Sequence, residues 1–123
     1  MPHSTEFLDP AFSYAVVGAS TDVTKWGHKV FLALRDNGYQ VTPINPNAAA
    51  ISSDRAYPTL TALAEHKGKP DLVVCVVQPT ITELIISECI QLGIKRLWMQ
   101  PGAESNEAVR LCNENDIKVM IAT

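Results

Sequence analysis

The feature that most constrains this sequence is an apolar strand that stops at a glycine and leads through a small-residue loop into a helix. The strand is predicted over residues 13–18 and the helix over residues 27–37. β-branched and aromatic residues favour the strand, whereas Val30, Phe31 and Leu34 recur at the spacing of one helix face. In parallel α/β proteins this arrangement presents backbone N–H groups to an anion. The segment therefore constrains both the fold and the class of ligand.

The rest of the chain alternates strands and helices with short connections. Further strands are predicted over residues 40–44, 71–77, 94–99 and 117–121, and further helices over residues 60–66, 80–92 and 105–115. Strict alternation predicts a three-layer, doubly wound parallel sheet of about five strands. We expect the strand order 3-2-1-4-5, with strands numbered along the chain, because right-handed crossovers permit it.

Local signals support the helix boundaries. Thr59 is in position to cap the second helix, and Gly38 and Gly93 stand where left-handed residues end helices. Thr80 and Glu83 form the pattern of a capping box at the start of the third helix. The buried face of this third helix is predicted to consist of Ile81, Ile85, Cys89 and Leu92.

Length and charge limit the classes of function. The chain has 123 residues and a formal net charge of −3. We expect a single domain over residues 13–123 after an N-terminal tail at residues 1–12. The net negative charge argues against nucleic-acid binding, and no apolar run reaches the length of a membrane span.

The sequence also predicts a cytoplasmic location. Residues 1–10 lack the basic and apolar regions of a signal peptide. Cys75, Cys89 and Cys112 lie at apolar positions without metal-binding spacing, and we interpret them as buried thiols in a reducing compartment.

Four loops rich in Gly, Pro, Ser and Asn follow the predicted strands. They cover residues 18–27, 45–46, 78–79 and 99–102. In doubly wound sheets the ligand lies beyond the carboxyl ends of the strands, at the point where the strand order reverses. We expect that point between the first and fourth strands, and we expect the four loops to converge there.

The first loop has the residue types of a phosphate site. Gly18 allows a sharp turn, Ser20 offers a hydroxyl, Lys25 offers a positive charge, and Gly27 leaves room near the helix N-terminus. His28 lies in the first turn of the helix and can donate to an anion. As a structural alternative, each glycine simply ends a strand or packs a helix.

Two common nucleotide motifs are missing from this loop. After Gly18 the next glycine is Gly27, so neither G-x-G-x-x-G nor the NTPase P-loop pattern is present. The second strand ends at Asn45-Pro46, where an NAD site usually has Asp or Glu for the ribose hydroxyls. The loop thus disfavours NAD but is compatible with a ligand that carries a phosphate on its ribose. Trp26 at the end of the loop either covers an adenine or pantetheine arm or packs at the helix entrance.

These motifs resemble the CoA-binding Rossmann-like domain, a family of small proteins related to the amino-terminal domain of the succinyl-CoA synthetase α subunit. The resemblance covers the chain from about Tyr14 to its end. The matching pieces are Val17-Gly18-Ala19-Ser20, the pair Lys25 and Gly27, Ile44-Asn45-Pro46, Tyr57-Pro58-Thr59-Leu60, Val77-Gln78-Pro79 and Trp98-Met99-Gln100-Pro101-Gly102-Ala103.

The resemblance implies coenzyme A, or an acyl-CoA, as the ligand, bound by the loops that follow the strands. By match, the phosphates would contact the first loop, at Gly18, Ala19, Ser20, Lys25 and Gly27. The adenosine end would lie by the second loop. The third loop would flank the opposite side of the cleft, and the fourth would form its floor. The residues concerned are Asn45 and Pro46, then Gln78 and Pro79, then Met99, Gln100, Pro101 and Gly102.

We interpret the chain as a small CoA-binding module that senses, carries or sequesters the cofactor or recruits a partner. The sequence shows no catalytic constellation and no metal-ligand cluster, so we do not expect an enzyme. One alternative is an NAD(P)-dependent oxidoreductase or redox sensor. The other is a scaffold or subunit with a vestigial cleft, favoured by Gln78 where the family more often has proline. A homodimer or a protein partner is compatible with all three.

Overall fold

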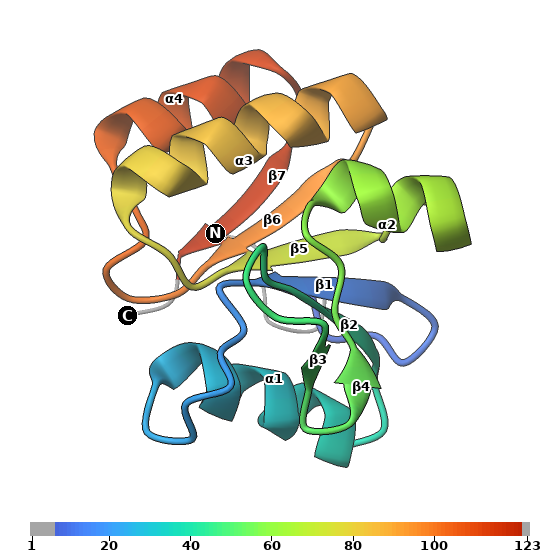
Figure 1. The fold of residues 1–123 in the computed structure, drawn as a ribbon. Helices are drawn as coiled ribbons and strands as arrows, with labels where there is room; N and C mark the ends of the chain where they lie inside the picture. Colours follow the sequence, from blue (N-terminus) through green and yellow to red (C-terminus); the bar gives the residue numbers. More distant parts are fainter. Residues whose placement is uncertain (1–6, 122–123) are drawn as a thin grey trace.

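A parallel sheet of five strands forms the centre of the molecule, in the order β2-β1-β5-β6-β7 (Figure 1). The structure is a computed structural model and describes residues 7–121. The strands are β1 (Ser13–Val17), β2 (Gln40–Ile44), β3 (Ala50–Ile51), β4 (Asp54–Arg55), β5 (Leu72–Cys75), β6 (Arg96–Met99) and β7 (Lys118–Ile121). The helices are α1 (Trp26–Asp36), α2 (Leu60–Lys67), α3 (Pro79–Leu92) and α4 (Asn106–Glu114).

The helices cover the two faces of the sheet, which confirms the three-layer, doubly wound architecture. Helix α1 packs on one face together with Phe7 and the residues around the β3–β4 hairpin. Helices α2, α3 and α4 pack on the other face (Figure 1). Strand β5 is buried along its whole length because helices or loops cover it on both sides.

The strand order differs from the expected 3-2-1-4-5. Strand β5 pairs with β1 and not with β2, so the five long strands follow the order 2-1-3-4-5. Right-handed crossovers allow both orders, so the alternation alone could not choose between them. Pro43 in β2 nevertheless favours the observed order, in which β2 is an edge strand. A proline lacks the N–H that a strand in the interior of a sheet needs.

A short hairpin covers part of the outer edge of β2, where the sequence predicted only a loop. Strands β3 and β4 pair antiparallel through a turn at Ser52 and Ser53, both of which have positive φ. The chain then returns at Tyr57, whose backbone N–H donates to the Pro43 carbonyl at 3.1 Å. Two-residue strands are too short to show a period in the sequence.

Helix α3 begins and faces differently from the prediction. Its first residue is Pro79 and its N-cap is Gln78, so Thr80 is not a cap and the predicted capping box is absent. Thr82, Ile86 and Cys89 are its buried residues, whereas Ile81 is 41% exposed. The helix is apolar on most of its circumference, so its sequence pattern could not fix which face turns inward.

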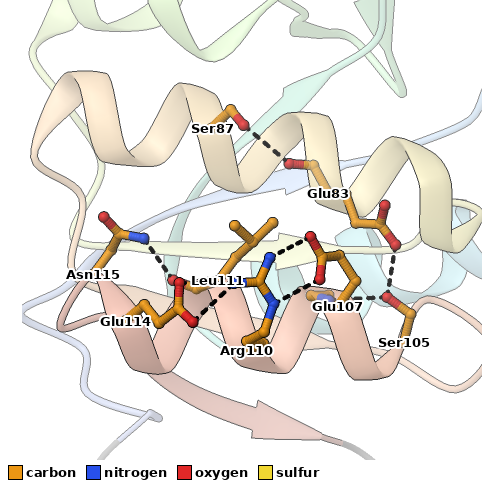
Figure 2. Close-up of polar contacts among 9 residues, drawn as sticks. Glu83, Ser87, Ser105, Glu107, Arg110, Leu111, Glu114 and Asn115 are labelled. Carbon is orange, nitrogen blue, oxygen red and sulfur yellow. Dashed lines mark hydrogen bonds and ion pairs between the residues drawn. The ribbon is translucent and has the colours of Figure 1, made fainter.

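Polar contacts join α3 to α4 on the outside of the molecule (Figure 2). The Ser105 hydroxyl donates to the Glu83 carboxylate at 2.8 Å and accepts from the Ala108 N–H at 3.0 Å. Arg110 donates to Glu107 and Glu114 along the exposed face of α4. This side of the molecule satisfies its polar groups internally.

The remaining boundaries follow the sequence. Thr59 caps α2 by accepting from the Ala62 N–H, and Gly38 and Gly93 both have positive φ after the helices they end. Within residues 7–121, no helix has the length and apolar character that crossing a bilayer requires.

Candidate functional site

The candidate site lies at the carboxyl end of the sheet, between β1 and β5, where the strand order reverses. Backbone hydrogen bonds tie the ends of four strands together there. The Gly18 N–H donates to the Ile44 carbonyl, the Val76 N–H to Val17, and the Gln100 N–H to Cys75. The four predicted loops therefore converge at this edge. The reversal point is at β1 and β5 and not, as expected, between the first and fourth strands.

Gly18 and Gly27 bring α1 unusually close to the end of β1. Gly18 has φ +96°, and a Cβ on it would stand 2.2 Å from the Val76 carbonyl oxygen. A Cβ on Gly27 would stand 1.9 Å from the Gly18 carbonyl oxygen. The small size of Gly27, which we interpreted as room for a phosphate, is thus required first by packing of the helix against its own loop.

Hydrogen bonds within the first loop fix its path. The Ser20 hydroxyl oxygen accepts from the Asp22 N–H at 3.0 Å, which leaves its proton for another acceptor. Asp22 accepts from the N–H and hydroxyl of Thr24. These bonds, above all the one from the Thr24 hydroxyl, lower the pKa of the exposed Asp22 carboxyl.

His28 is hydrogen-bonded to the backbone of the first loop. The residue is 6% exposed, and its Nδ1 lies 2.7 Å from the Ser20 carbonyl oxygen. Since a carbonyl only accepts, this contact places the proton on Nδ1. The predicted anion donor is therefore a residue that positions the loop through Ser20.

Asn45 plays a similar role at the end of β2. Its Nδ2 donates to the Ala19 carbonyl at 2.9 Å, and its Oδ1 accepts from the Asn47 N–H at 2.7 Å. Both side-chain polar groups are used within the protein, and they hold the second loop against the first. Pro46 beside it is exposed.

Two helices point uncapped N-termini at this edge. Helix α1 has Lys25 at its N-cap and helix α3 has Gln78, and neither side chain caps its helix. Neither helix has an acidic residue in its first turn. The first N–H groups of a helix lack partners within it and carry partial positive charge, so these ends favour an anion. Pro79 at the start of α3 is compatible with this, because the N–H it lacks is one that a helix leaves unpaired.

A hollow of about 440 Å³ opens between these helix ends. Its lining brings together four predicted residues, Trp26, Gln78, Pro101 and Gly102, and two that the sequence reading missed, Val76 and Val77. The two valines directly follow the buried strand β5, which is the signal that could have identified them. The volume falls within the range of small-molecule sites.

Trp26, which lines this hollow, is hydrogen-bonded to Gln100. The Trp26 indole N–H donates to Gln100 Oε1 at 3.1 Å, and Trp26 as a residue is 53% exposed. The bond links the start of α1 to the end of β6 across the sheet edge. Of the two readings of Trp26, a cover for a ligand arm and a packing residue, the half-exposed residue is compatible with the first.

Met99 is separated from the site by its burial. Its side chain is fully buried in the core on the α3 and α4 face. The sequence reading missed Glu104, whose carboxylate accepts from the N–H of the lining residue Gly102 at 3.0 Å.

The chemistry available at this edge is binding by backbone amides, hydroxyls and one lysine. No group of three or more His, Cys, Asp or Glu within residues 7–121 could hold a metal ion. Cys75, Cys89 and Cys112 are buried free thiols, as predicted. Burial raises the pKa of each thiol, that of Cys112 to about 11, so they are poor nucleophiles near neutral pH.

Comparison with known proteins relates the chain to enzymes that handle CoA. The model of the family described as "CoA binding domain" matches residues 13–122. The chain is 34% identical over 85 residues to an ADP-forming acetate–CoA ligase II of Archaeoglobus fulgidus, covering 68% of this chain and 12% of that protein. It is 33% identical over 90 residues to the α subunit of the corresponding Pyrococcus furiosus enzyme, covering 72% of this chain and 19% of that subunit.

The chain thus spans less than a fifth of the length of these two ligases. A solved structure matches over nearly its whole length. It is a conserved hypothetical protein from Pyrococcus furiosus with 32% identity and a TM-score of 0.83, and the match covers 91% of this chain and 94% of that one.

Proposed function

The chain belongs to the CoA binding domain family, and on that premise we propose that it is a small CoA-binding module whose ligand lies in the hollow between α1 and α3. The observation that carries the proposal is the pair of uncapped helix N-termini beside that hollow. Diphosphate groups suit such ends, because N–H groups and helix dipoles both favour negative charge.

The polarity of the site supports coenzyme A over a nicotinamide dinucleotide. At the end of β2 the side chain of Asn45 is committed to Ala19 and Asn47, and no carboxylate stands there to accept from ribose hydroxyls. A phosphate on the ribose meets no charge repulsion from a neutral residue. The apolar side, built from Trp26, Val76 and Val77, suits the pantetheine arm.

We infer a role in binding and not in catalysis. The groups that line the hollow are amides, apolar side chains and a tryptophan. Such a site can sense, carry or sequester the cofactor, or present it to a partner. Since two relatives named above are ligases, one of them a subunit, an interaction with a second protein fits this role.

Ligand-dependent stabilisation tests the proposal. Thermal unfolding should be measured with CoA, dephospho-CoA, NADP and NAD. A ligand at 100 times its Kd stabilises the native state by about 2.7 kcal/mol, and we expect CoA to give the largest rise in Tm. A larger rise with NAD or NADP would replace the proposal with a redox function. No rise with any of the four would favour a scaffold with an unused cleft.

A pair of matched variants locates the ligand. Gln78→Glu adds a negative charge at the cleft end of α3, and Gln91→Glu adds the same charge near the far end of that helix. We expect the first to weaken CoA binding about tenfold through repulsion of the phosphates, and the second to leave it unchanged. Equal effects would place the phosphates elsewhere.

A further inference from the structure

The outer edge of strand β2 is covered at its carboxyl half and open at its amino half. Successive residues of a strand point their backbone groups to opposite sides. The Ile44 carbonyl accepts from the loop after β1, so Val41 and Pro43 face outward, away from β1. Tyr57 occupies the carboxyl half of this edge, because its N–H donates to Pro43 at 3.1 Å and its carbonyl accepts from the Asn45 N–H at 2.9 Å.

The amino half of the edge keeps a free donor and a free acceptor. The N–H and carbonyl of Val41 point outward, and neither has a hydrogen-bond partner among residues 7–121. Proline at position 43 loses no bond to β1, because its nitrogen faces the same outer side. Exposed strand edges of this kind are templates for pairing with another chain.

A hollow of about 510 Å³ follows this edge, and we call it the edge groove. Its lining includes Val41, Thr42, Arg55, Tyr57, Leu63 and Lys67. Helix α2 and the β3–β4 hairpin stand on its two sides, because Leu63 belongs to the core on one face of the sheet and Ala56 to the core on the other. Within residues 7–121, the edge groove shares no lining residue with the hollow between α1 and α3.

The edge groove is basic, although the chain as a whole has a net charge of −3. Arg35 and Asp54 both line it and pair with each other at 3.4 Å, so their charges offset. Arg55 and Lys67 have no carboxylate within ion-pair distance in the part of the chain that the structure describes. The Arg55 guanidinium lies over the Tyr57 ring instead, 4.7 Å from its centroid. Two positive charges therefore remain free beside the open edge.

We propose that the edge groove binds an extended, acidic segment of a partner protein, which adds to β2 as a further strand. The segment donates to the Val41 carbonyl and accepts from the Val41 N–H, as strand addition requires. Its carboxylates complement Arg55 and Lys67. A second copy of this chain is disfavoured, because pairing two β2 edges about a twofold axis brings like cations together. The inference does not depend on CoA binding, and it identifies a surface through which the module recruits a partner.

Selection of random heptapeptides displayed on phage, with the intact protein immobilised, supplies a probe. We expect the enriched sequences to be rich in Asp and Glu and to lack proline at their centre. Synthetic peptides of these sequences are then measured by fluorescence anisotropy. Their affinity should fall as salt is added, because salt screens the charges. Enrichment of no peptide, or only of peptides without acidic residues, would overturn the inference.

Two pairs of variants, each checked for folding by circular dichroism, locate the bound peptide. Val41→Pro removes the outward N–H, whereas Val41→Thr keeps it with a side chain of similar shape. Lys67→Glu reverses a charge in the groove, and Lys118→Glu makes the same change on β7, the other edge strand. We expect Val41→Pro and Lys67→Glu to weaken peptide binding about fivefold each, and the controls less than about twofold. Binding that survives Val41→Pro would overturn strand addition.

Amide hydrogen exchange of the wild type gives a measurement that needs no variant. The Val41 N–H should exchange at least about fivefold more slowly when the peptide is bound, whereas exchange in β7 should not change. Unchanged exchange at Val41 in the presence of a bound peptide would overturn the inference. A dimer in sedimentation that Val41→Pro converts to a monomer would also overturn it, because a second copy would then occupy the edge.

Discussion

Helices α2 and α4 begin at groups supplied by the protein, whereas α1 and α3 begin without them. Thr59 and Ser105 cap α2 and α4 by accepting from backbone N–H groups. The first turn of α2 also donates to a carboxylate from α3, through the N–H and hydroxyl of Thr61 to Glu88. The N-cap side chains of α1 and α3 make no such bond.

This difference separates the part of the molecule built for stability from the part available to a ligand. At a capped helix end, such as the Ser105 end of α4 in Figure 2, a side chain of the protein accepts from one of the free backbone donors. At the uncapped ends no N-cap side chain accepts from these N–H groups, so they can bind an external anion. The comparison predicts that changes at a capped helix end will mainly alter the free energy of unfolding. Changes at an uncapped end will mainly alter the affinity for CoA.

The largest effect on stability is expected from Gly27→Ala. The new Cβ would overlap the Gly18 carbonyl oxygen, so α1 must move away from the loop, at a cost of about 3 kcal/mol. Urea unfolding measures the loss. Gly38→Ala is the matched control, because a Cβ there meets nothing within 4 Å and only the positive φ is unfavourable, at about 1 kcal/mol. Equal losses would contradict the packing role of Gly27.

Removal of a cap should come next. Ser105→Ala removes the bond from the Ala108 N–H and leaves Glu83 without its donor, so we expect a loss of about 1–2 kcal/mol in the free energy of unfolding. CoA affinity should not change, since α4 lies outside the hollow. If the affinity fell as much as the stability, α4 would have to be included in the site.

The opposite change at α1 sharpens the comparison. Lys25→Asp would provide the cap that this helix lacks and raise the stability of the free protein by about 1 kcal/mol. It should also weaken CoA binding at least tenfold, because the carboxylate occupies the N–H groups and repels the phosphates. Calorimetry of Lys25→Gln separates loss of the lysine charge from competition by the new cap. Gain of stability without loss of binding would show that the phosphates do not use this helix end.

The smallest effect is expected on the exposed face of α4. Arg110 bridges Glu107 and Glu114 in Figure 2, and the side chains of all three are about half exposed. Solvent and salt screen such pairs, so Arg110→Ala should shift the urea midpoint less than any change above, and the shift should shrink further with added salt. A loss as large as that of Ser105→Ala would show that the ion pairs help to lock α3 against α4.

The elements that surround the candidate site could be predicted because their signals are local. The loop after β1, the ends of the strands and the cap at Thr59 follow from residue types a few positions apart. The roles of Asn45 and His28 could not be predicted, because each depends on a carbonyl that folding brings near, at Ala19 or Ser20. The burial of Met99 in the core could not be predicted for the same reason, since strand periodicity does not say which face of the sheet a helix covers.

The sequence by itself determined the alternation of strands and helices, the glycine turn and the ends of most helices, since these depend on backbone preferences within a few residues. Tertiary structure alone decided how Asn45 reaches the Ala19 carbonyl, how Trp26 comes beside Gln100 and how closely Gly27 approaches Gly18. These are contacts between residues distant in the chain, and packing and hydrogen-bond geometry select them from several arrangements that the local pattern permits.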